Sequence, residues 1–271
     1  MNSLLEMFSY DFMIRALIVG LLLSLSAALI GVPLVLRKNS MIGDGLSHVG
    51  FGAFAIASVL GLAPLPVALP IVILASTLIL KLDSSRRLNG DAAIALISTS
   101  ALALGTFIVS IVGSNIDINN YLFGSILSLG RSDVVVAIIL VALVLPLFAI
   151  LYNRIFAVTF DETFARSIGL STRFYNLIFA VVCSIVIVLG MRLMGALLIS
   201  ALIIFPVLSA KQIATSYKAV VFSSIIISLL SFMVGLIASY ILNTPTGATI
   251  VLSSLIFFLL SGLLSKIFKI H

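Results

Sequence analysis

The sequence predicts an all-α protein that crosses a membrane about nine times. Of its 271 residues, 62% are hydrophobic and only 9% are charged, and the mean hydropathy is +1.36. Soluble domains have about 25% charged residues. Several stretches of the chain also contain no Asp, Glu, Lys or Arg over the roughly 20 residues that a membrane-spanning helix needs. The composition argues against a soluble enzyme, a nucleic-acid-binding protein and a disordered chain.

Seven charge-free stretches give the spans of this predicted fold. Two of them are too long for one helix, and each contains a turn signal: Pro64 and Pro66 in the first, and residues 243–247 in the second. The stretches therefore predict nine helices. Only Arg192 separates the sixth predicted helix from the seventh. The stretches are 16–36, 45–80, 92–116, 134–153, 174–191, 193–210 and 219–265.

The basic residues indicate how the nine helices are oriented. If the loop that contains Arg37 and Lys38 is cytoplasmic, 12 of the 15 basic residues fall on the cytoplasmic side and 3 on the outside. Cytoplasmic loops of membrane proteins are enriched in Lys and Arg. We therefore expect the N-terminus outside the cell and the C-terminus inside. The net charge of +6 then reflects topology, and no nucleic acid is expected as a partner.

The chain is expected to form a single transmembrane domain, residues 1–271, with two further segments at its outer surface. Residues 1–12 are expected to form a short amphipathic helix there. The outer connection, 113–133, is apolar enough around residues 121–125 to enter the bilayer.

The inner connection, 154–173, contains a short amphipathic stretch. Asp161 and Glu162 lie near its start, where the helix dipole favours acidic residues, and Gly169 is placed to close it. Such a helix on the cytoplasmic face is either an ordinary interfacial helix or a docking element for a partner protein.

One pair of polar residues stands out within the predicted spans. Asp44 is the only acidic residue well inside a span, and His48 follows four residues later on the same face of the helix. Ionisable side chains inside a membrane are costly and mark sites or pathways. Imidazole and carboxylate together bind first-row divalent ions such as zinc, manganese and iron. The pair is interpreted as part of a metal site, as a proton relay or as a contact that only packs helices.

The rest of the sequence adds few strong metal ligands. The single cysteine, Cys183, lies in an apolar run, and the glycines around the pair (Gly43, Gly45, Gly50 and Gly52) favour close helix packing over ion contact. A site of two strong ligands is loose, as a transport pathway requires, because the ion must also leave. No phosphate-binding glycine loop and no recognisable catalytic motif is present, so no enzymatic activity is expected.

Four segments resemble the membrane permease subunits of bacterial ABC importers for zinc, manganese and iron. Residues 43–48 are similar to that family's signature at the start of its second span. Residues 121–125 are similar to an outer-loop segment, and residues 161–169 to the segment that docks on the ATPase. Residues 195–202, with Pro206, are similar to a late helix rich in small residues. The resemblance extends over nearly the whole chain.

This resemblance implies an architecture related to the cobalamin- and siderophore-type importers. It implies a permease homodimer, an ATPase dimer that hydrolyses ATP, and an extracellular metal-binding protein that delivers the ion. Asp44 and His48 would form a transient metal site, and the resemblance adds Ser47 and Ser200 as further ligands. The residues it implies for coupling to the ATPase are Asp161, Glu162, Ala165 and Gly169.

The resemblance also places the chain in the bacterial cell membrane and favours zinc as the transported ion, with manganese second and no permanently bound cofactor. Three alternatives stay open. One is an ion-coupled secondary transporter that uses Asp44 and His48 as a proton relay and needs no ATPase. Another is a membrane scaffold protein in which the pair is structural. The third is a siderophore or cobalamin permease, and the pair argues against it, because a permease for such bulky ligands needs no metal-ligating pair.

Overall fold

A computed structural model of the chain describes residues 9–84, 90–112, 124 and 126–267. This part of the chain is helical and contains no strand. Nine of its helices are long and apolar enough to cross a membrane, which confirms the predicted number. They are α2 (Asp11–Leu36), α3 (Ile42–Val59), α4 (Pro64–Ser84), α5 (Gly90–Val112), α7 (Arg131–Phe160), α9 (Thr172–Met194), α10 (Ala196–Ile213), α11 (Tyr217–Leu242) and α12 (Thr246–Ile267). A short helix, α8 (Glu162–Ser167), and a 3-10 turn, η1 (Ile126–Ser128), complete the described elements.

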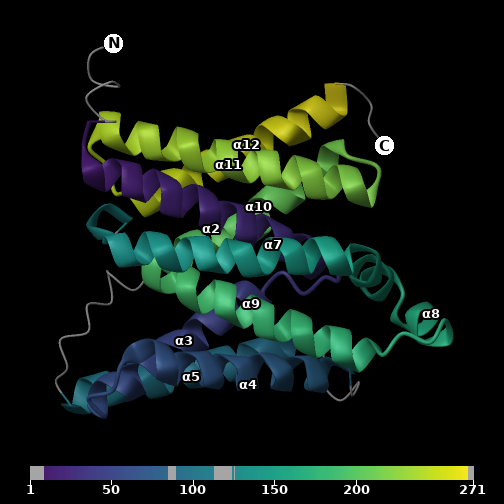
Figure 1. Cartoon of the computed structure of the whole chain (residues 1–271), viewed down its shortest axis with the longest axis horizontal. Coiled ribbons are helices and arrows are strands. Elements are labelled where there is room, and N and C mark those ends of the chain that lie inside the picture. The colour runs from purple at the N-terminus through teal and green to yellow at the C-terminus, as the bar shows by residue number, and fades with distance from the viewer. Residues whose placement is uncertain (1–8, 85–89, 113–123, 125, 268–271) are drawn as a thin grey trace.

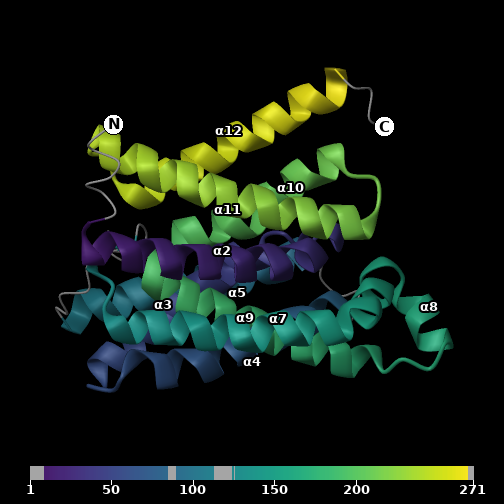
Figure 2. The ribbon, with the colours of Figure 1, turned by 45° about the horizontal axis from the view of Figure 1, so that its top comes forward.

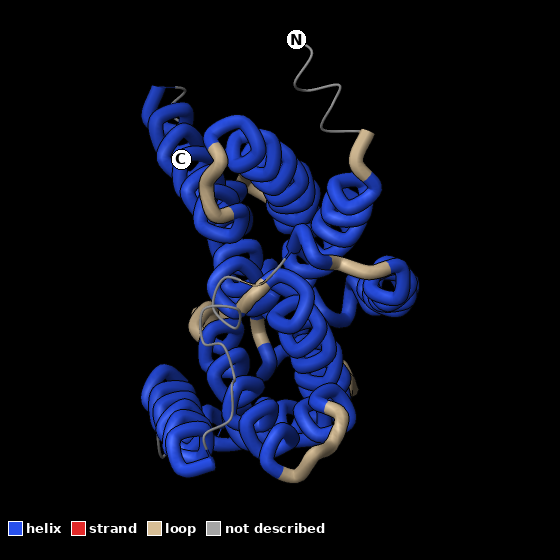
Figure 3. Tube along the Cα trace, turned by 90° about the vertical axis from the view of Figure 1, so that its left-hand side faces the viewer, coloured by secondary structure: helices blue, strands red, loops and turns tan. Residues whose placement is uncertain are grey.

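The long helices form a bundle with two distinct ends. Figure 1 shows α2 beginning at one end and α8 projecting from the other, which is called the α8 end below. Helices α3, α4 and α5 pack together on one side, and α10, α11 and α12 on the other. Helices α2 and α9 lie between these two groups, as Figures 1 and 2 show. Figure 3 shows the bundle in a view along its helices. One contiguous apolar core runs through the described helices.

Glycine at the end of α9 separates the sixth and seventh spans. The structure places the break at Gly195, whose φ of +92° is open to glycine and strained for other residues. The expected separation at Arg192 is therefore displaced by three residues. Arg192 lies in the last turn of α9, because a charged side chain does not itself end a helix.

Two outer segments of the sequence interpretation fall largely outside the described residues. Of the expected amphipathic segment 1–12, residues 1–8 are not described, and Asp11 and Phe12 form the first turn of α2. Residues 121–125 were expected to form an outer-loop segment, and only Gly124 of these residues is described. A side chain on Gly124 would collide with the backbone of Met194, so this residue lies directly against the end of α9.

Close backbone approach at glycines holds the bundle together. A Cβ atom on Gly52 of α3 would lie 2.7 Å from the carbonyl oxygen of Ala101, and one on Gly105 of α5 would lie 2.9 Å from the Cα of Gly52. A Cβ atom on Gly31 of α2 would collide with the carbonyl oxygen of Ile203 in α10. Lipid is as apolar as leucine, so helices in a membrane gain stability through such close packing.

We expect Gly52→Ala to destabilise the protein by about 1–3 kcal/mol, because the added methyl group forces α3 away from α5. The temperature of unfolding in detergent, followed by circular dichroism at the helix band, measures this effect. Gly130→Ala is the matched control, because its methyl group would have no heavy atom closer than Ser132 Oγ at 3.6 Å. Equal unfolding temperatures for the two variants would contradict the prediction.

Candidate metal site and coupling segment

Asp44 and His48 lie in the first two turns of α3 and face the same side of the helix. The His48 Nε2 and Asp44 Oδ2 atoms are 3.5 Å apart. The side chains are partly open, with 41% of Asp44 and 25% of His48 exposed. The structure therefore brings the two predicted residues together as an imidazole–carboxylate pair that a third group or an ion can still reach.

Three neighbouring helices hold this part of α3 in place. A Cβ atom on Gly43 would lie 3.2 Å from Ile203 of α10. One on Gly45 would lie 2.6 Å from Ile94 of α5, and one on Gly50 would lie 2.7 Å from Met191 of α9. The interpretation of these glycines as packing residues is confirmed, because α5, α9 and α10 each approach α3 where it has no side chain. The backbone that carries Asp44 and His48 is fixed by this packing.

The two serines differ in how they relate to the pair. The Ser47 hydroxyl is buried and donates a hydrogen bond of 2.7 Å to the Asp44 carbonyl oxygen, within its own helix. The Ser200 hydroxyl is also buried and has no hydrogen-bond partner among the described residues. Ser200 precedes Ile203 by three residues on α10, which runs opposite to α3, and Ile203 contacts Gly43. Ser200 therefore lies near the level of Ser47 and His48 along α3.

No group of three or more His, Cys, Asp or Glu side chains comes together in the described part of the chain. Cys183 is buried in α9, as its apolar surroundings predict. The described residues thus bring one carboxylate and one imidazole together at Asp44 and His48 and add no third side chain of these types.

The inner segment 154–173 contains the predicted short helix, α8. Asp161 is its N-cap, and the Oδ1 atom accepts a hydrogen bond of 2.9 Å from the Phe164 amide. Gly169 has a φ of +85°, and its amide and that of Leu170 bond back to the carbonyl groups of Arg166 and Ala165. This arrangement closes the helix as a Schellman motif. Asp161 and Gly169 therefore define the two ends of α8, as predicted.

The middle of α8 has one inward and one outward face. Ala165 is fully buried and seats the helix on the bundle, and Glu162 pairs with Arg166 at 2.6 Å between Oε1 and Nη2. Phe164 and Ile168 are each 55% exposed, although both are large and apolar. These two residues were not predicted from the sequence, although their spacing of four places them on one face of a helix.

Arg37 joins three elements at the α8 end. Its Nη1 donates a hydrogen bond of 2.9 Å to Asn176 Oδ1 of α9, and its guanidinium lies 5.8 Å from the centre of the Phe179 ring. Burial lowers the pKa of Arg37 from its usual value, and the nearby Glu162 carboxylate of α8 partly offsets this. Arg37 and Asn176 are 139 residues apart, so no local sequence pattern pointed to this contact.

At the opposite end, a second polar contact links α7 and α9. Asp133 Oδ2 accepts a hydrogen bond of 2.9 Å from the Gly130 amide, and its other oxygen lies 3.8 Å from Arg192 Nη2. This contact lies beside the Gly195 break and fixes the turn between α9 and α10 relative to the start of α7.

Membrane proteins of metal transport systems are similar in sequence to this chain over nearly its whole length. A "Probable iron transport system membrane protein" of Haemophilus influenzae is 32% identical, over 98% of this chain and 94% of that protein. The manganese import system permease protein ScaB of Streptococcus parasanguinis is 31% identical, over 93% of this chain and 90% of that protein. The high-affinity zinc uptake system membrane protein ZnuB of Haemophilus influenzae is 29% identical, over 93% and 97%.

Two solved structures and a family model also match nearly the whole chain. The structure of PsaBC from Streptococcus pneumoniae in complex with Fab contains a chain that matches with a TM-score of 0.85 and 30% identity, over 96% of this chain and 94% of that one. An inward-facing metal-chelate type ABC transporter shares the fold, with a TM-score of 0.71 and 16% identity over 95% of this chain and 86% of that one. The family described as "ABC 3 transport family" matches residues 9–265, and the chain therefore belongs to that family.

Proposed function

We propose that this chain is the permease subunit of an ATP-driven importer for a divalent transition-metal ion, with zinc first and manganese second. The observation that carries the proposal is the Asp44–His48 pair, whose Oδ2 and Nε2 atoms are 3.5 Å apart on the tightly held start of α3. The chemistry of the pair suits these ions. The names of similar proteins, which refer to iron, manganese and zinc transport, support the same class of cargo.

The ion would bind transiently between two copies of the permease. One copy supplies one carboxylate and one imidazole, and a second copy related by two-fold symmetry would supply the same set again. The Ser200 hydroxyl, buried without a partner, and the Ser47 hydroxyl are the next oxygen donors along α3 and α10. Such a site of few protein ligands holds an ion weakly enough to release it during alternating access.

The membrane orientation in this proposal follows the charges at the two ends of the bundle. Arg37, Lys81, Arg166 and Arg173 lie at the α8 end. Arg15 and Arg131 line a shared hollow at the opposite end. Helix α8 then lies in the cytoplasm, and the N-terminus lies outside. An extracellular metal-binding protein would deliver the ion to the outer end.

Coupling to ATP would pass through α8. The partner ATPase dimer would hydrolyse ATP, and the permease would respond without any catalytic group of its own. Phe164 and Ile168 give α8 an exposed apolar surface, while Ala165 anchors the helix on the bundle. Exposed apolar side chains that are grouped together are typical of a protein–protein contact. Asp161, Glu162 and Gly169 fix the shape of the helix that carries it.

We expect His48→Ala to reduce uptake of labelled zinc by about tenfold or more, because even outer-shell partners of metal ligands contribute about 10–100-fold to affinity or activity. Uptake into proteoliposomes that contain the permease, the ATPase and the binding protein measures this. The matched control is His271→Ala, which removes the only other histidine. Normal uptake by the His48 variant would overturn the site, and uptake that needs no ATP would favour a secondary transporter.

Phe164→Ala combined with Ile168→Ala is expected to weaken binding of the ATPase by about 30-fold or more, because each truncation removes roughly 1 kcal/mol or more of apolar contact. Co-purification and ATPase stimulation measure the effect. Phe222→Ala, on the exposed side of α11, is the control for loss of an exposed aromatic side chain. If the double variant binds and stimulates the ATPase normally, α8 is not the docking element.

The order of ions is tested by competition. Labelled zinc uptake into the same proteoliposomes is expected to be inhibited more strongly by unlabelled zinc than by manganese or iron, because imidazole is a stronger ligand for zinc. Stronger inhibition by manganese would reverse the proposed order and leave the Asp44–His48 site intact. Uptake of an iron chelate in place of the free ions would overturn the proposed cargo.

A further inference from the structure

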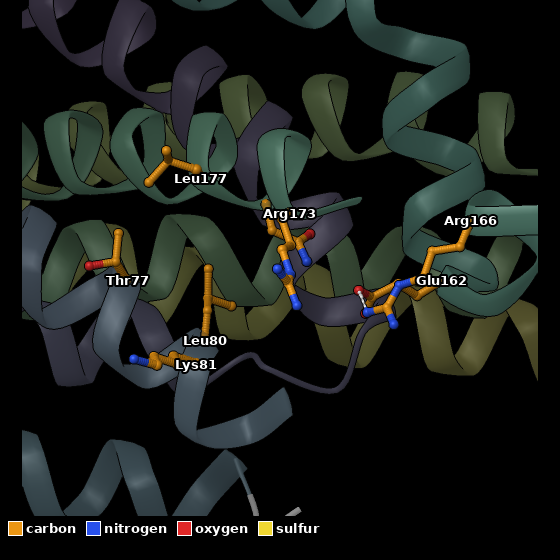
Figure 4. A pocket seen from close by; sticks show the side chains of 8 residues that line it. Thr77, Leu80, Lys81, Glu162, Arg166, Arg173 and Leu177 are labelled. Atoms are coloured by element: carbon orange, nitrogen blue, oxygen red, sulfur yellow. Dashed lines mark hydrogen bonds and ion pairs between the residues drawn. The ribbon is translucent and has the colours of Figure 1, made fainter. Parts of the chain in front are cut away.

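A groove of about 650 Å³ lies at the α8 end, where α4 ends and α9 begins (Figure 4). We call it the basic groove. It opens at the surface of the chain, and residues of α4, α8 and α9 line it. The lining residues are Thr77, Leu80, Lys81, Glu162, Arg166, Arg173, Asn176 and Leu177.

Cations predominate among the described residues that line the basic groove. They are Lys81, Arg166 and Arg173, and the one carboxylate among these residues, Glu162, is paired with Arg166 at 2.6 Å. Arg173 makes no hydrogen bond or ion pair with the described residues. Figure 4 shows Arg173 between Leu80 and Lys81 of α4 on one side and the Glu162–Arg166 pair of α8 on the other. The groove therefore offers a guanidinium to an anion.

A second hollow, of about 320 Å³, adjoins the basic groove and shares Leu80, Glu162 and Asn176 with it. Arg37 and Lys38 add two more cations there. Two buried polar atoms that line this hollow, Arg37 Nε and Thr159 Oγ1, have no partner among the described residues, and Thr159 is only 9% exposed. Cations therefore line both the basic groove and the adjoining hollow, and the unmet hydrogen-bond donors belong to residues of the adjoining hollow.

The basic groove is also amphipathic along the helix axes. Near the C-terminal end of α4, Lys81 lies one turn closer to that end than Thr77. Near the N-terminal end of α9, Arg173 lies one turn closer to that end than Leu177. Leu177 is 50% exposed, and the Thr77 hydroxyl is satisfied within its own helix, where it donates to the Leu74 carbonyl oxygen. Each helix therefore carries a cation at its end, and one turn further in it carries an apolar side chain (Leu177) or a hydroxyl that is already hydrogen-bonded (Thr77).

We propose that the basic groove binds an anionic phospholipid of the leaflet at the α8 end. Its phosphate would lie against Arg173 and Lys81, and one acyl chain would run past Leu177 and Leu80. Basic pockets between membrane helices on the cytoplasmic side bind acidic headgroups. The assignment to the cytoplasmic leaflet rests on the orientation proposed above. Because Glu162 and Arg166 belong to α8, the bound lipid touches the segment proposed to dock the ATPase.

The test measures lipid bound to the full chain in detergent by native mass spectrometry, with dioleoyl phosphatidylglycerol and dioleoyl phosphatidylcholine as probes. Arg173→Gln combined with Lys81→Gln is expected to weaken phosphatidylglycerol binding about tenfold or more, since each cation contributes roughly 1 kcal/mol near an acidic surface. Phosphatidylcholine binding is expected to change little. The matched control is Lys211→Gln combined with Lys218→Gln, two exposed cations at the same end that do not line the groove.

Two further variants separate the sources of the signal. Arg173→Lys with Lys81→Arg keeps both charges and is expected to retain phosphatidylglycerol, which shows that loss in the Gln variant reflects charge and not misfolding. Leu177→Gln is expected to weaken the lipid while leaving protection by inorganic phosphate unchanged. Equal protection by inorganic phosphate and by phosphatidylglycerol in thermal unfolding would overturn the lipid assignment. Equal loss of lipid in the Lys211 and Lys218 control would overturn the groove as the site. None of these outcomes depends on metal transport, so the proposed function can fail while this proposal stands.

Discussion

Close approach of helix backbones at glycine is the constraint on which the rest of this structure depends. In a membrane, burial of apolar side chains gives helices little reason to associate, because lipid is equally apolar. Close packing at glycine must then supply the specificity. Helix α3 shows this most clearly: the backbone of α5 approaches it at Gly52, and side chains of α5, α10 and α9 pack against it at Gly45, Gly43 and Gly50. The same helix carries Asp44 and His48, so the contacts that define the bundle also set the position of the polar pair.

The spans and the polar pair could be predicted from the sequence, because the chain has so few charged residues and histidines that their positions are easy to interpret. With only nine acidic residues and two histidines in 271 residues, one carboxylate and one imidazole four positions apart within an apolar span stand out. The nine spans follow from the same scarcity of charge. The helix break at Gly195 was misplaced to Arg192, because charge was used as the boundary where backbone conformation decides it. The contact of Arg37 with Asn176 joins residues 139 positions apart, and only the folded chain brings them together.

The α8 end gathers most of the polar interactions that the bundle interior excludes. Arg37 lies directly after α2, bonds to α9 through Asn176 and feels the charge of Glu162 in α8. Four residues later, Met41 is the N-cap of α3, the helix that contains Asp44 and His48. The short connection between α2 and α3 therefore leads into the start of the proposed ion path, and its Arg37 lies within electrostatic range of α8, the segment proposed to contact an ATPase. The basic groove shares Glu162 and Asn176 with the hollow that Arg37 lines.

The connection at Gly195 has a consequence for how the chain enters the membrane. A single residue between two antiparallel spans leaves no hydrophilic loop to be carried across the bilayer. Helices α9 and α10 therefore have to insert together as a hairpin, and neither can serve as an independent stop or start signal during synthesis. The wider turn between α11 and α12, around Asn243 and Pro245, is under no such restriction. An insertion at Gly195 would divide a unit that the membrane accepts only whole.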